Sequence, residues 1–595
     1  MSESGITHLR VFPLWSDFQP LTALYAKTAY EYSFGEASLP DTEAGRAGVS
    51  EEACEKFEHF CDTAAKYNLK LIVALITGQM SFRWFVPPAF EGKNPLSDPT
   101  VMKWQLRFVK YFVNRFKEKK AIVGWDLGNE VNTMTIDENP DQFYVWCAGI
   151  ANVVKACDSE HPVISGIDNS NVEKGNSNLK NIGEICDIHT THPYNIFATA
   201  SQPINTMVPI LDLAFKCRLG EDIAGIPTFV QEFGSIGYMN CSSKTEADFY
   251  RASLYTSLAH NCYGTMWWCA FDQGHHRFAP YNWNNIGSDY GFFDKDRNPK
   301  PIASEHLHFY RMLDKLPGRK LPEYQRDGVI VIPRDDGDAN LDTLRTAFVL
   351  GKRANLDLGF AYGLDKIPDA PLYILPSLSQ NKSIPANRLD ELLEKVENGA
   401  VLYVSVDTAL IRQVPEIFGV EIGCRECCTT VKNVLMGEEK LPFVVNAEYM
   451  IESTTAKVIA CDDKGMPVFF QKQRGKGYVY FFLVPMEKYL TQKRGAFFHK
   501  DEPAYDLIFR ELARTAGIKR RIDCDSPFLR FTEHPIDDES AYICAINYSS
   551  EPVEARIEVN GGAFTTVVGA APEAGVLRLG GNDGAIFRFV RVQMP

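Results

Sequence analysis

Residues 121–132 read AIVGWDLGNEVN, an apolar run that ends abruptly in polar residues. A run of this kind predicts a strand that is buried on both faces, as in a parallel sheet. Glu130 would lie at the carboxyl end of this strand. Burial of a carboxylate without a partner costs free energy, so its presence there needs a functional reason. We therefore interpret Glu130 as a functional group.

The chain on both sides of this stretch, from residue 5 to about 300, alternates β-rich runs with amphipathic helices such as 51–66 and 100–117. This alternation predicts βα units around a parallel sheet. The predicted strands are 8–12, 69–77, 121–127, 162–166, 185–190, 228–231 and 264–270. The pattern is closest to an eightfold (β/α) TIM barrel over residues 1–317 with its first strand missing, so that the chain is truncated or a remote segment supplies that strand.

The pattern changes after residue 317. Short apolar strands at 328–333, 372–376 and 401–406, with helices over 341–354, 387–398 and 502–516, predict a small flavodoxin-like α/β domain over 318–520. It has no phosphate-binding glycine loop. From residue 527 only strands are expected, so residues 521–595 are predicted to form a C-terminal antiparallel β-sandwich.

The composition narrows the classes of partner. The 595 residues carry a formal charge of −14, which argues against nucleic acid and membrane surfaces and favours an uncharged substrate. The 15 cysteines have no framework spacing, and the cluster from Cys424 to Cys428 is expected to be a turn between strands rather than a metal site. With no signal peptide and no membrane span seen, a cytoplasmic protein is expected.

Polar and aromatic residues follow the predicted barrel strands, at the end of the barrel where reactive groups collect. They are Arg10 with Trp15, Asn129 with Glu130, His192 with Tyr194, Gln231 with Glu232, and Trp267 and Trp268 with Asp272 and Gln273. Two carboxylates that face each other are what cleavage of a glycosidic bond requires, because one protonates the leaving oxygen while the other attacks or activates water.

Four motifs, GWDLGNE (124–130), HPY (192–194), PTFVQEFG (227–234) and MWWCAF (266–271), give the region 5–300 a family resemblance. Their order and intervals resemble the clan A retaining β-glycosidases, and most closely the branch of glycoside hydrolase family 5 that includes β-mannosidases and β-mannanases. The α/β domain resembles the amidotransferase-like domain of some clan A β-galactosidases, where it assists oligomerisation, so a homo-oligomer formed through this domain is expected. No cofactor and no metal are implied.

The resemblance assigns a role to each matching residue. Glu130 matches the acid/base, held protonated by burial and by the charge of the nucleophile. Glu232 matches the ionised nucleophile, with Arg10 and Tyr194 as hydrogen-bond donors, and retention implies that the two carboxyl groups lie about 5–5.5 Å apart. Asn129 matches the residue that binds the sugar 2-hydroxyl.

The other assignments concern the walls of the cleft. His192 matches a histidine that orients the sugar or the acid/base, and Trp268 matches the aromatic platform under the sugar, although a slip of one residue would select Trp267. Rim positions are assigned to Trp15, Trp84, Trp283 and Asp272. The histidine that many family 5 enzymes carry after the third strand is missing, so Gln79 or Arg83 is expected to fill that corner.

These residues predict a retaining exo-β-mannosidase that acts on a β-linked oligosaccharide by double displacement. Exo action is preferred because insertions at residues 26–50 and 78–98 could close one end of the cleft. Endo-β-1,4-mannanase, β-glucosidase, β-galactosidase and cellulase activities stay open. The alternative from another class is a catalytically inactive carbohydrate-binding barrel or an inactive fragment.

Overall fold

The computed structural model describes all residues except 26, 135–138, 174, 176, 198–201, 284–285, 335–338, 381–383 and 593–595. It divides into two compact units. The first comprises Met1–Tyr194, Ala224–Lys244 and Cys262–Arg311, and the second comprises Asn195–Ile223, Thr245–Asn261 and Met312–Pro595. The predicted division into three domains at residues 317 and 520 stays a prediction.

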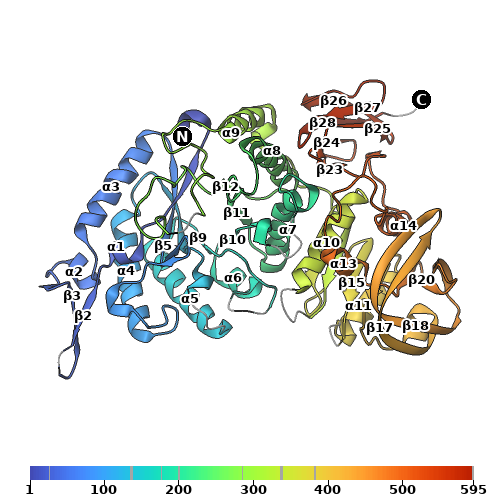
Figure 1. Cartoon of the computed structure of the whole chain (residues 1–595), viewed down its shortest axis with the longest axis horizontal. Helices are drawn as coiled ribbons and strands as arrows, with labels where there is room; N and C mark the ends of the chain where they lie inside the picture. The colour runs from blue at the N-terminus through green and yellow to red at the C-terminus, as the bar shows by residue number, and fades with distance from the viewer. Residues whose placement is uncertain are drawn as a thin grey trace. The chain divides into compact units, whose positions relative to one another are not determined.

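The first unit is built on seven parallel strands (Figure 1). They are β1 (His8–Val11), β5 (Lys70–Ile76), β8 (Ile122–Gly128), β9 (Val163–Ile164), β10 (His189–Thr191), β11 (Thr228–Phe233) and β12 (Thr265–Trp267). The strands pair in the orders β1-β5-β8-β9 and β10-β11-β12, and a parallel bridge between Ile164 and Ile188 joins the two groups. This is the strand order of a (β/α) barrel.

The two outer strands of this series are β1 and β12. In the described part of the chain no strand pairs with both of them. Their carboxyl ends are nevertheless neighbours, because the rings of Phe12 and Trp268 meet edge to face with centroids 5.5 Å apart. Before β1, the carbonyl of Gly5 lies 3.2 Å from Nε2 of His306 in α9 (Pro301–Met312).

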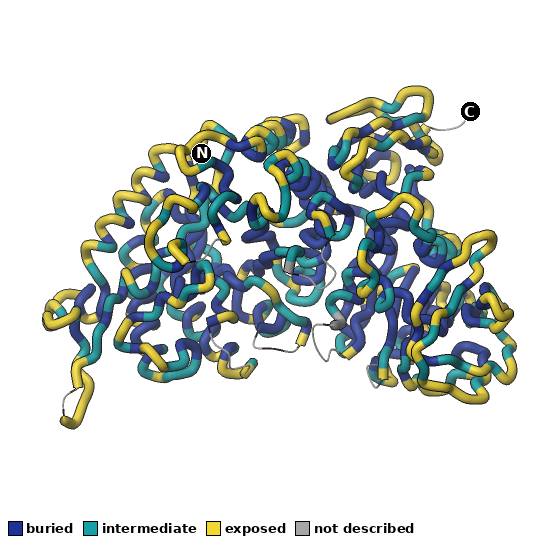
Figure 2. The backbone as a smooth tube through the Cα atoms, in the orientation of Figure 1, coloured by how far each residue is buried: buried dark blue, intermediate teal, exposed yellow. Residues whose placement is uncertain are grey.

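The long helices between the strands form where their apolar periodicity predicts them, as α3 (Glu51–Lys66) and α4 (Pro99–Phe116). At the start of α4, Oδ1 of Asp98 accepts hydrogen bonds from the backbone N–H groups of Thr100 and Val101, a cap that satisfies free donors of the first turn. The inner face of α4, with Phe108, Phe112 and Phe116, is fully buried (Figure 2). These rings belong to the core between helices and strands.

The unit contains further helices and short antiparallel strands. The helices are α1 (Trp15–Phe18), α2 (Glu43–Ala47), α5 (Pro140–Cys157) and α6 (Leu179–Ile185). The antiparallel strands are β2 (Thr22–Tyr25), β3 (Tyr30–Phe34), β4 (Ala37–Ser38), β6 (Gln79–Met80) and β7 (Arg83–Trp84). Because α6 runs to Ile185, β10 begins later than the sequence pattern predicts.

The second unit contains α7 (Met207–Ala224), α8 (Ser243–Ala259) and a nine-stranded mixed sheet. In spatial order the strands are β14 (Leu358–Tyr362), β13 (Gly328–Ile332), β15 (Leu372–Leu378), β16 (Val401–Val406), β21 (Gly477–Phe482), β20 (Pro467–Arg474), β19 (Lys457–Asp462), β17 (Val420–Met436) and β18 (Glu439–Thr454). Its other helices are α10 (Ala339–Arg353), α11 (Ala386–Glu397), α12 (Val414–Phe418), α13 (Met486–Gln492) and α14 (Leu507–Thr515).

The cysteine cluster corrects one expectation. Cys424, Cys427 and Cys428 lie inside the long strand β17 and not in a turn. The strand pairs with β18 over its whole length, and register shifts near Ile422 and after Cys427 absorb the residues that break the alternating pattern.

The C-terminal part of the second unit consists of two antiparallel sheets with an apolar core between them. One sheet has β22 (Ile522–Cys524), β25 (Val553–Val559) and β27 (Val576–Leu579), and the other has β23 (Leu529–Pro535), β24 (Ser540–Asn547), β28 (Gly584–Arg591) and β26 (Gly562–Val568). Among the described residues, no helix has the length and apolar content that a membrane crossing needs.

Candidate active site

Two glutamates meet at the carboxyl ends of the strands in the first unit. Glu130 follows β8 in a left-handed conformation (φ 45°), and its backbone N–H donates to the carbonyl of Gly166 at 2.8 Å. Glu232 lies within β11. One oxygen of each carboxyl group and one ring nitrogen of His192 all lie within 4.8 Å of one another.

Glu232 is surrounded by hydrogen-bond donors. Nη1 of Arg10 donates to Oε1 at 2.6 Å, and the hydroxyl of Tyr194 donates to Oε2 at 3.2 Å. Burial raises the pKa of Glu232, while the charge of Arg10 and the hydroxyl of Tyr194 act to lower it. Burial also raises the pKa of Tyr194 well above its usual value, so this phenol remains a donor.

Glu130 has a different environment. Burial raises its pKa to about 8, the negative charge of Asp168 adds to this rise, and Arg10 opposes it. Its Oε1 lies 2.8 Å from Nδ1 of His192, and its side chain keeps 20% of its surface exposed. At neutral pH, Glu130 is therefore the carboxyl group that retains a proton, whereas Glu232, in contact with Arg10, ionises first.

A buried chain of hydrogen bonds leads away from His192. Its Nε2 lies 3.3 Å from Oε1 of Gln231, and Nε2 of Gln231 donates to Oδ2 of Asp126 at 2.9 Å. The same Asp126 oxygen accepts from Nε of Arg10 at 2.8 Å. A register shift in β11 between Val230 and Phe233 accounts for the presence of both Gln231 and Glu232 in the site, because strict alternation would send neighbouring side chains to opposite faces.

Asn129 is fixed from two sides. Its Oδ1 accepts from Nη1 of Arg10 at 2.9 Å, and its Nδ2 donates to the carbonyl of Gln79 at 3.0 Å. Gln79, rather than Arg83, therefore fills the corner beside Asn129. The guanidinium of Arg83 instead donates to the carbonyl of Ala279 at 2.7 Å.

The two tryptophans at the end of β12 both contact Tyr290. Nε1 of Trp268 donates to the Tyr290 hydroxyl at 3.0 Å, whereas Nε1 of Trp267 donates to the Tyr290 carbonyl at 2.9 Å. Trp267 also packs edge to face on Phe233, with centroids 5.1 Å apart. The choice of Trp268 as the sugar platform stays a prediction.

Two of the predicted rim residues are corrected. Trp15 begins α1 and is completely buried, with Nε1 bonded to Gln19 at 2.8 Å, because this helix turns its apolar face into the core. Asp272 is also buried, where it accepts hydrogen bonds from the backbone of Gly291 at 2.7 Å and from Lys300 at 3.2 Å. Trp84, in the short strand β7, and Trp283, in the segment after β12, are 50% and 66% exposed.

Asp168 contributes to the site although the sequence analysis did not name it, and Gln231, which was named beside Glu232, contributes in a way that was not predicted. Asp168 follows β9 in the same way that Glu130 follows β8, so its position at a strand end was the available signal. Gln231 precedes Glu232, and regular alternation would direct its side chain away from the site. Asp126 holds hydrogen bonds within the barrel.

Glu130, His192 and Glu232 are also the one group among the described residues whose spacing would suit a metal ion. The guanidinium of Arg10 already places a positive charge 2.6 Å from Glu232, which disfavours a second cation beside it. The arrangement is better suited to acid–base and nucleophilic chemistry.

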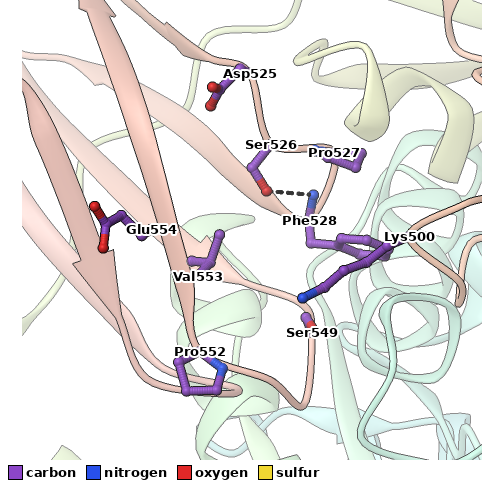
Figure 3. Close-up of a pocket in the computed structure, with 9 residues that line it drawn as sticks. All are labelled: Lys500, Asp525, Ser526, Pro527, Phe528, Ser549, Pro552, Val553 and Glu554. Atoms are coloured by element: carbon purple, nitrogen blue, oxygen red, sulfur yellow. Dashed lines mark hydrogen bonds between the residues drawn. The ribbon is translucent and has the colours of Figure 1, made fainter.

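The second unit contains a separate pocket, shown in Figure 3. Its walls come from Lys500, residues 525–528, Ser549 and residues 552–554, and Oγ of Ser526 accepts from the backbone N–H of Phe528 at 3.3 Å. Asp525 and Glu554, the two carboxylates among the lining residues, lie apart in this view. We therefore place the candidate active site in the first unit.

Comparison with known proteins agrees with this fold. No model of a known protein family matches the chain. A probable mannan endo-1,4-β-mannosidase F of Neosartorya fischeri is 20% identical over 177 residues, or 29% of this chain, and its counterpart in Aspergillus fumigatus is 20% identical over 187 residues, or 31%. These matches span 36% and 40% of the length of the two relatives.

Two solved structures resemble most of the chain. The exo-β-1,4-mannosidase Op5Man5 from Opitutaceae bacterium strain TAV5 has a TM-score of 0.67 and 19% identity, over 82% of this chain and 87% of that one. A β-galactosidase from the haloarchaeon Halorubrum lacusprofundi has a TM-score of 0.70 and 10% identity, over 100% and 96%. At these identities the likeness concerns the fold.

Proposed function

We propose that this chain, a clan A glycoside hydrolase by its fold and its distant sequence relatives, is a retaining β-glycosidase that acts on β-mannosides. The observation that carries the proposal is the pair of carboxyl groups with oxygens within 4.8 Å, one held by Arg10 and the other beside a neutral histidine. This separation fits the retaining geometry better than the inverting one, in which a water molecule must fit between the two groups.

The geometry supports a double displacement. Glu232, stabilised as a carboxylate by Arg10 and Tyr194, attacks the anomeric carbon while protonated Glu130 gives its proton to the leaving oxygen. Water then displaces Glu232 from the sugar, and Glu130 takes the proton of that water. Asn129, held by Arg10 and Gln79, is positioned to bind the 2-hydroxyl of the sugar.

Mannose as the sugar rests on the motif resemblance and on the two mannanases that match in sequence. A β-galactosidase is the second candidate, because enzymes of that name share the fold over the whole chain. β-Glucosidase and cellulase activities, and a non-catalytic carbohydrate-binding barrel, are the further alternatives. Self-association through the α/β part of the second unit belongs to the same proposal.

Exo action is supported by the loops on one side of the site. The carboxyl of Glu130 is directed toward His192 at the end of β10, so the leaving group would lie on that side. On the opposite rim, the loops after β5 and β12 are tied together by Arg83 and Ala279 at 2.7 Å and by the hydroxyls of Ser81 and Tyr281 at 3.5 Å. A closed rim there would leave room for a single sugar before the cleaved bond.

The test is hydrolysis of nitrophenyl β-mannoside, β-glucoside and β-galactoside, followed by trapping with a 2-deoxy-2-fluoro glycosyl fluoride of the preferred sugar. We expect turnover of the mannoside and a covalent label on the peptide that contains Glu232. A mannobioside with a blocked non-reducing end should not be cleaved, since it needs space for two sugars. Glu118→Gln, a change at an exposed glutamate outside both insertions, serves as the control and should keep full activity.

Each part of the proposal has its own contrary outcome. No turnover of any β-glycoside by a well-folded sample would support the non-catalytic alternative. Turnover with the label on another residue would overturn the assignment of Glu232. Cleavage of the blocked mannobioside at the rate of the simple mannoside would overturn exo action alone.

A further inference from the structure

The hydrogen bonds behind His192 restrict where protons can lie. Asp126 is fully buried; burial raises its pKa, and the charge of Arg10, bonded to Oδ2 at 2.8 Å, lowers it. Its Oδ1 also accepts from the backbone N–H of Gly128 at 3.2 Å. With donors on both oxygens and a guanidinium in contact, Asp126 acts as an ionised acceptor.

An ionised Asp126 fixes the orientation of Gln231. Only the amide NH₂ of Gln231 can approach Oδ2 of Asp126 to 2.9 Å, because the amide oxygen would be repelled there. The oxygen of Gln231 must then face Nε2 of His192, 3.3 Å away. An acceptor at this position requires that Nε2 of His192 carries a hydrogen.

Burial lowers the pKa of His192, so the buried ring is neutral and has one N–H group. If that group is at Nε2, then Nδ1 presents a lone pair to Oε1 of Glu130, 2.8 Å away. Two acceptors at this distance repel each other unless one of them holds a proton. The carboxyl of Glu130 is the group that can supply it.

We propose that Gln231 and Asp126 are positioning residues that fix His192 with its hydrogen on Nε2 and thereby hold a proton on Glu130. The catalytic meaning of this inference rests on the proposed function, whereas the location of the hydrogen on the His192 ring is independent of it. This arrangement favours both the step in which Glu130 gives a proton and the step in which it takes one. The carboxyl keeps its proton until a substrate arrives, and after losing it becomes a stronger base toward water.

Other charged groups also act on Glu130. Asp168 after β9 favours the protonated form, Arg10 from β1 favours the ionised form, and the neighbouring Glu232 and Tyr194 complete the surroundings from β11 and β10. These groups stay in place when Gln231 is changed. A shift on substitution of Gln231 would therefore report the effect of the ring orientation of His192.

The direct test is ¹⁵N NMR of the wild-type protein labelled in histidine, with His192→Asn to assign the signal. We expect a neutral ring whose hydrogen is on Nε2 between pH 6 and 8. A hydrogen on Nδ1, which would let His192 donate to a carboxylate at Glu130, overturns the proposal. This measurement needs no turnover, so it remains decisive even if the proposed activity fails.

The kinetic test compares Gln231→Met with Gln231→Glu. The methionine variant frees the ring to place its hydrogen on Nδ1 and to donate to Glu130, so the alkaline limb of kcat/KM should move down by about one pH unit, a tenfold change in proton affinity. In Gln231→Glu, a protonated carboxyl can donate to Asp126 and accept from His192, so the limb should return toward that of the wild type.

Melting curves of all three proteins establish that they are folded, and the order of their pH profiles then tests the relay. An alkaline limb that stays at the wild-type position in a folded Gln231→Met variant overturns the relay. So does a limb that moves equally in both variants, since the change would then come from altered packing rather than from the proton on His192.

Discussion

The two glutamates of the candidate site are the same side chain at two strand ends, yet their surroundings differ. Glu232 has a guanidinium at 2.6 Å and a phenol at 3.2 Å, so donors meet both of its oxygens. Glu130 has a neutral imidazole at 2.8 Å and the negative charge of Asp168 nearby. The neighbours, and not the strand ends themselves, therefore decide which carboxyl group holds the proton.

The largest effect should come from replacing each glutamate by glutamine. Glu232→Gln removes the nucleophile and should lower kcat/KM by about 10⁴-fold or more on every substrate. Glu130→Gln should cost about 10²- to 10⁴-fold on substrates with poor leaving groups, because these need a proton. The loss in Glu130→Gln should be much smaller on a dinitrophenyl glycoside, because dinitrophenolate leaves without receiving a proton. The values of kcat/KM on a series of aryl glycosides test the expected losses in both variants.

The dependence on leaving group is what separates the two residues. If Glu130→Gln lowers kcat/KM equally for substrates with good and with poor leaving groups, Glu130 is not the proton donor. In Glu130→Ala and Glu232→Ala, which open space for an anion, azide should restore turnover with products of opposite anomeric configuration, since it replaces a nucleophile in one and a base-assisted water in the other. The same configuration from both variants would contradict the assignment.

Much of this comparison could be predicted from the sequence, because it depends on local order. Buried runs that end in Asn-Glu or Gln-Glu place both carboxyl groups at one end of a parallel sheet whatever the details of packing. The helices α3 and α4 follow in the same way from their apolar periodicity. Trp15 and Asp272 were assigned wrongly because burial depends on how a short helix or loop turns after the strand ends.

The family resemblance names Arg10 and Tyr194 as donors to Glu232 and His192 as a neighbour of the acid/base, but residue patterns alone could not do so. Arg10 reaches Glu232 across 222 positions of the chain, and the contact of Gln231 with Asp126, across 105 positions, was not predicted at all. Gln231 enters the site because β11 departs from regular register, which no alternation pattern reveals. The turn of Glu130 into a left-handed conformation is likewise set by its neighbours, since its N–H bonds to Gly166.

A smaller effect is expected from Asp168, which acts only on the Glu130 side of the comparison. Asp168→Asn keeps the shape of the side chain and removes the negative charge that favours a proton on Glu130. The alkaline limb of kcat/KM, expected near pH 8 in the wild type, should move down by up to about one pH unit. Asp141→Asn, at an exposed position in α5, should leave it in place. An unchanged or raised limb in Asp168→Asn would show that Glu130 is insensitive to this charge.

The smallest effect concerns stability and has opposite signs at the two sites. Burial raises the pKa of Glu130 to about 8 in the folded protein, above the value of about 4.3 expected in the unfolded chain. Between these values the unfolded state loses the proton first, so this residue lowers the free energy of unfolding as the pH rises toward 8. Below both values it makes no such contribution.

Glu130→Gln cannot lose a proton, so it should melt about 2–4 °C above the wild type at pH 8 and close to it at pH 4.5 in calorimetry at a fixed scan rate. Glu232→Gln should instead lower Tm at pH 8, because it leaves the buried guanidinium of Arg10 without its carboxylate partner. Both variants remove negative charge at pH 8, a full unit at Glu232 and part of a unit at Glu130, so a general effect of net charge would move them in the same direction. If Tm shifts in the same direction at pH 8 in both variants, the different surroundings of the two glutamates do not change the free energy of unfolding in opposite directions.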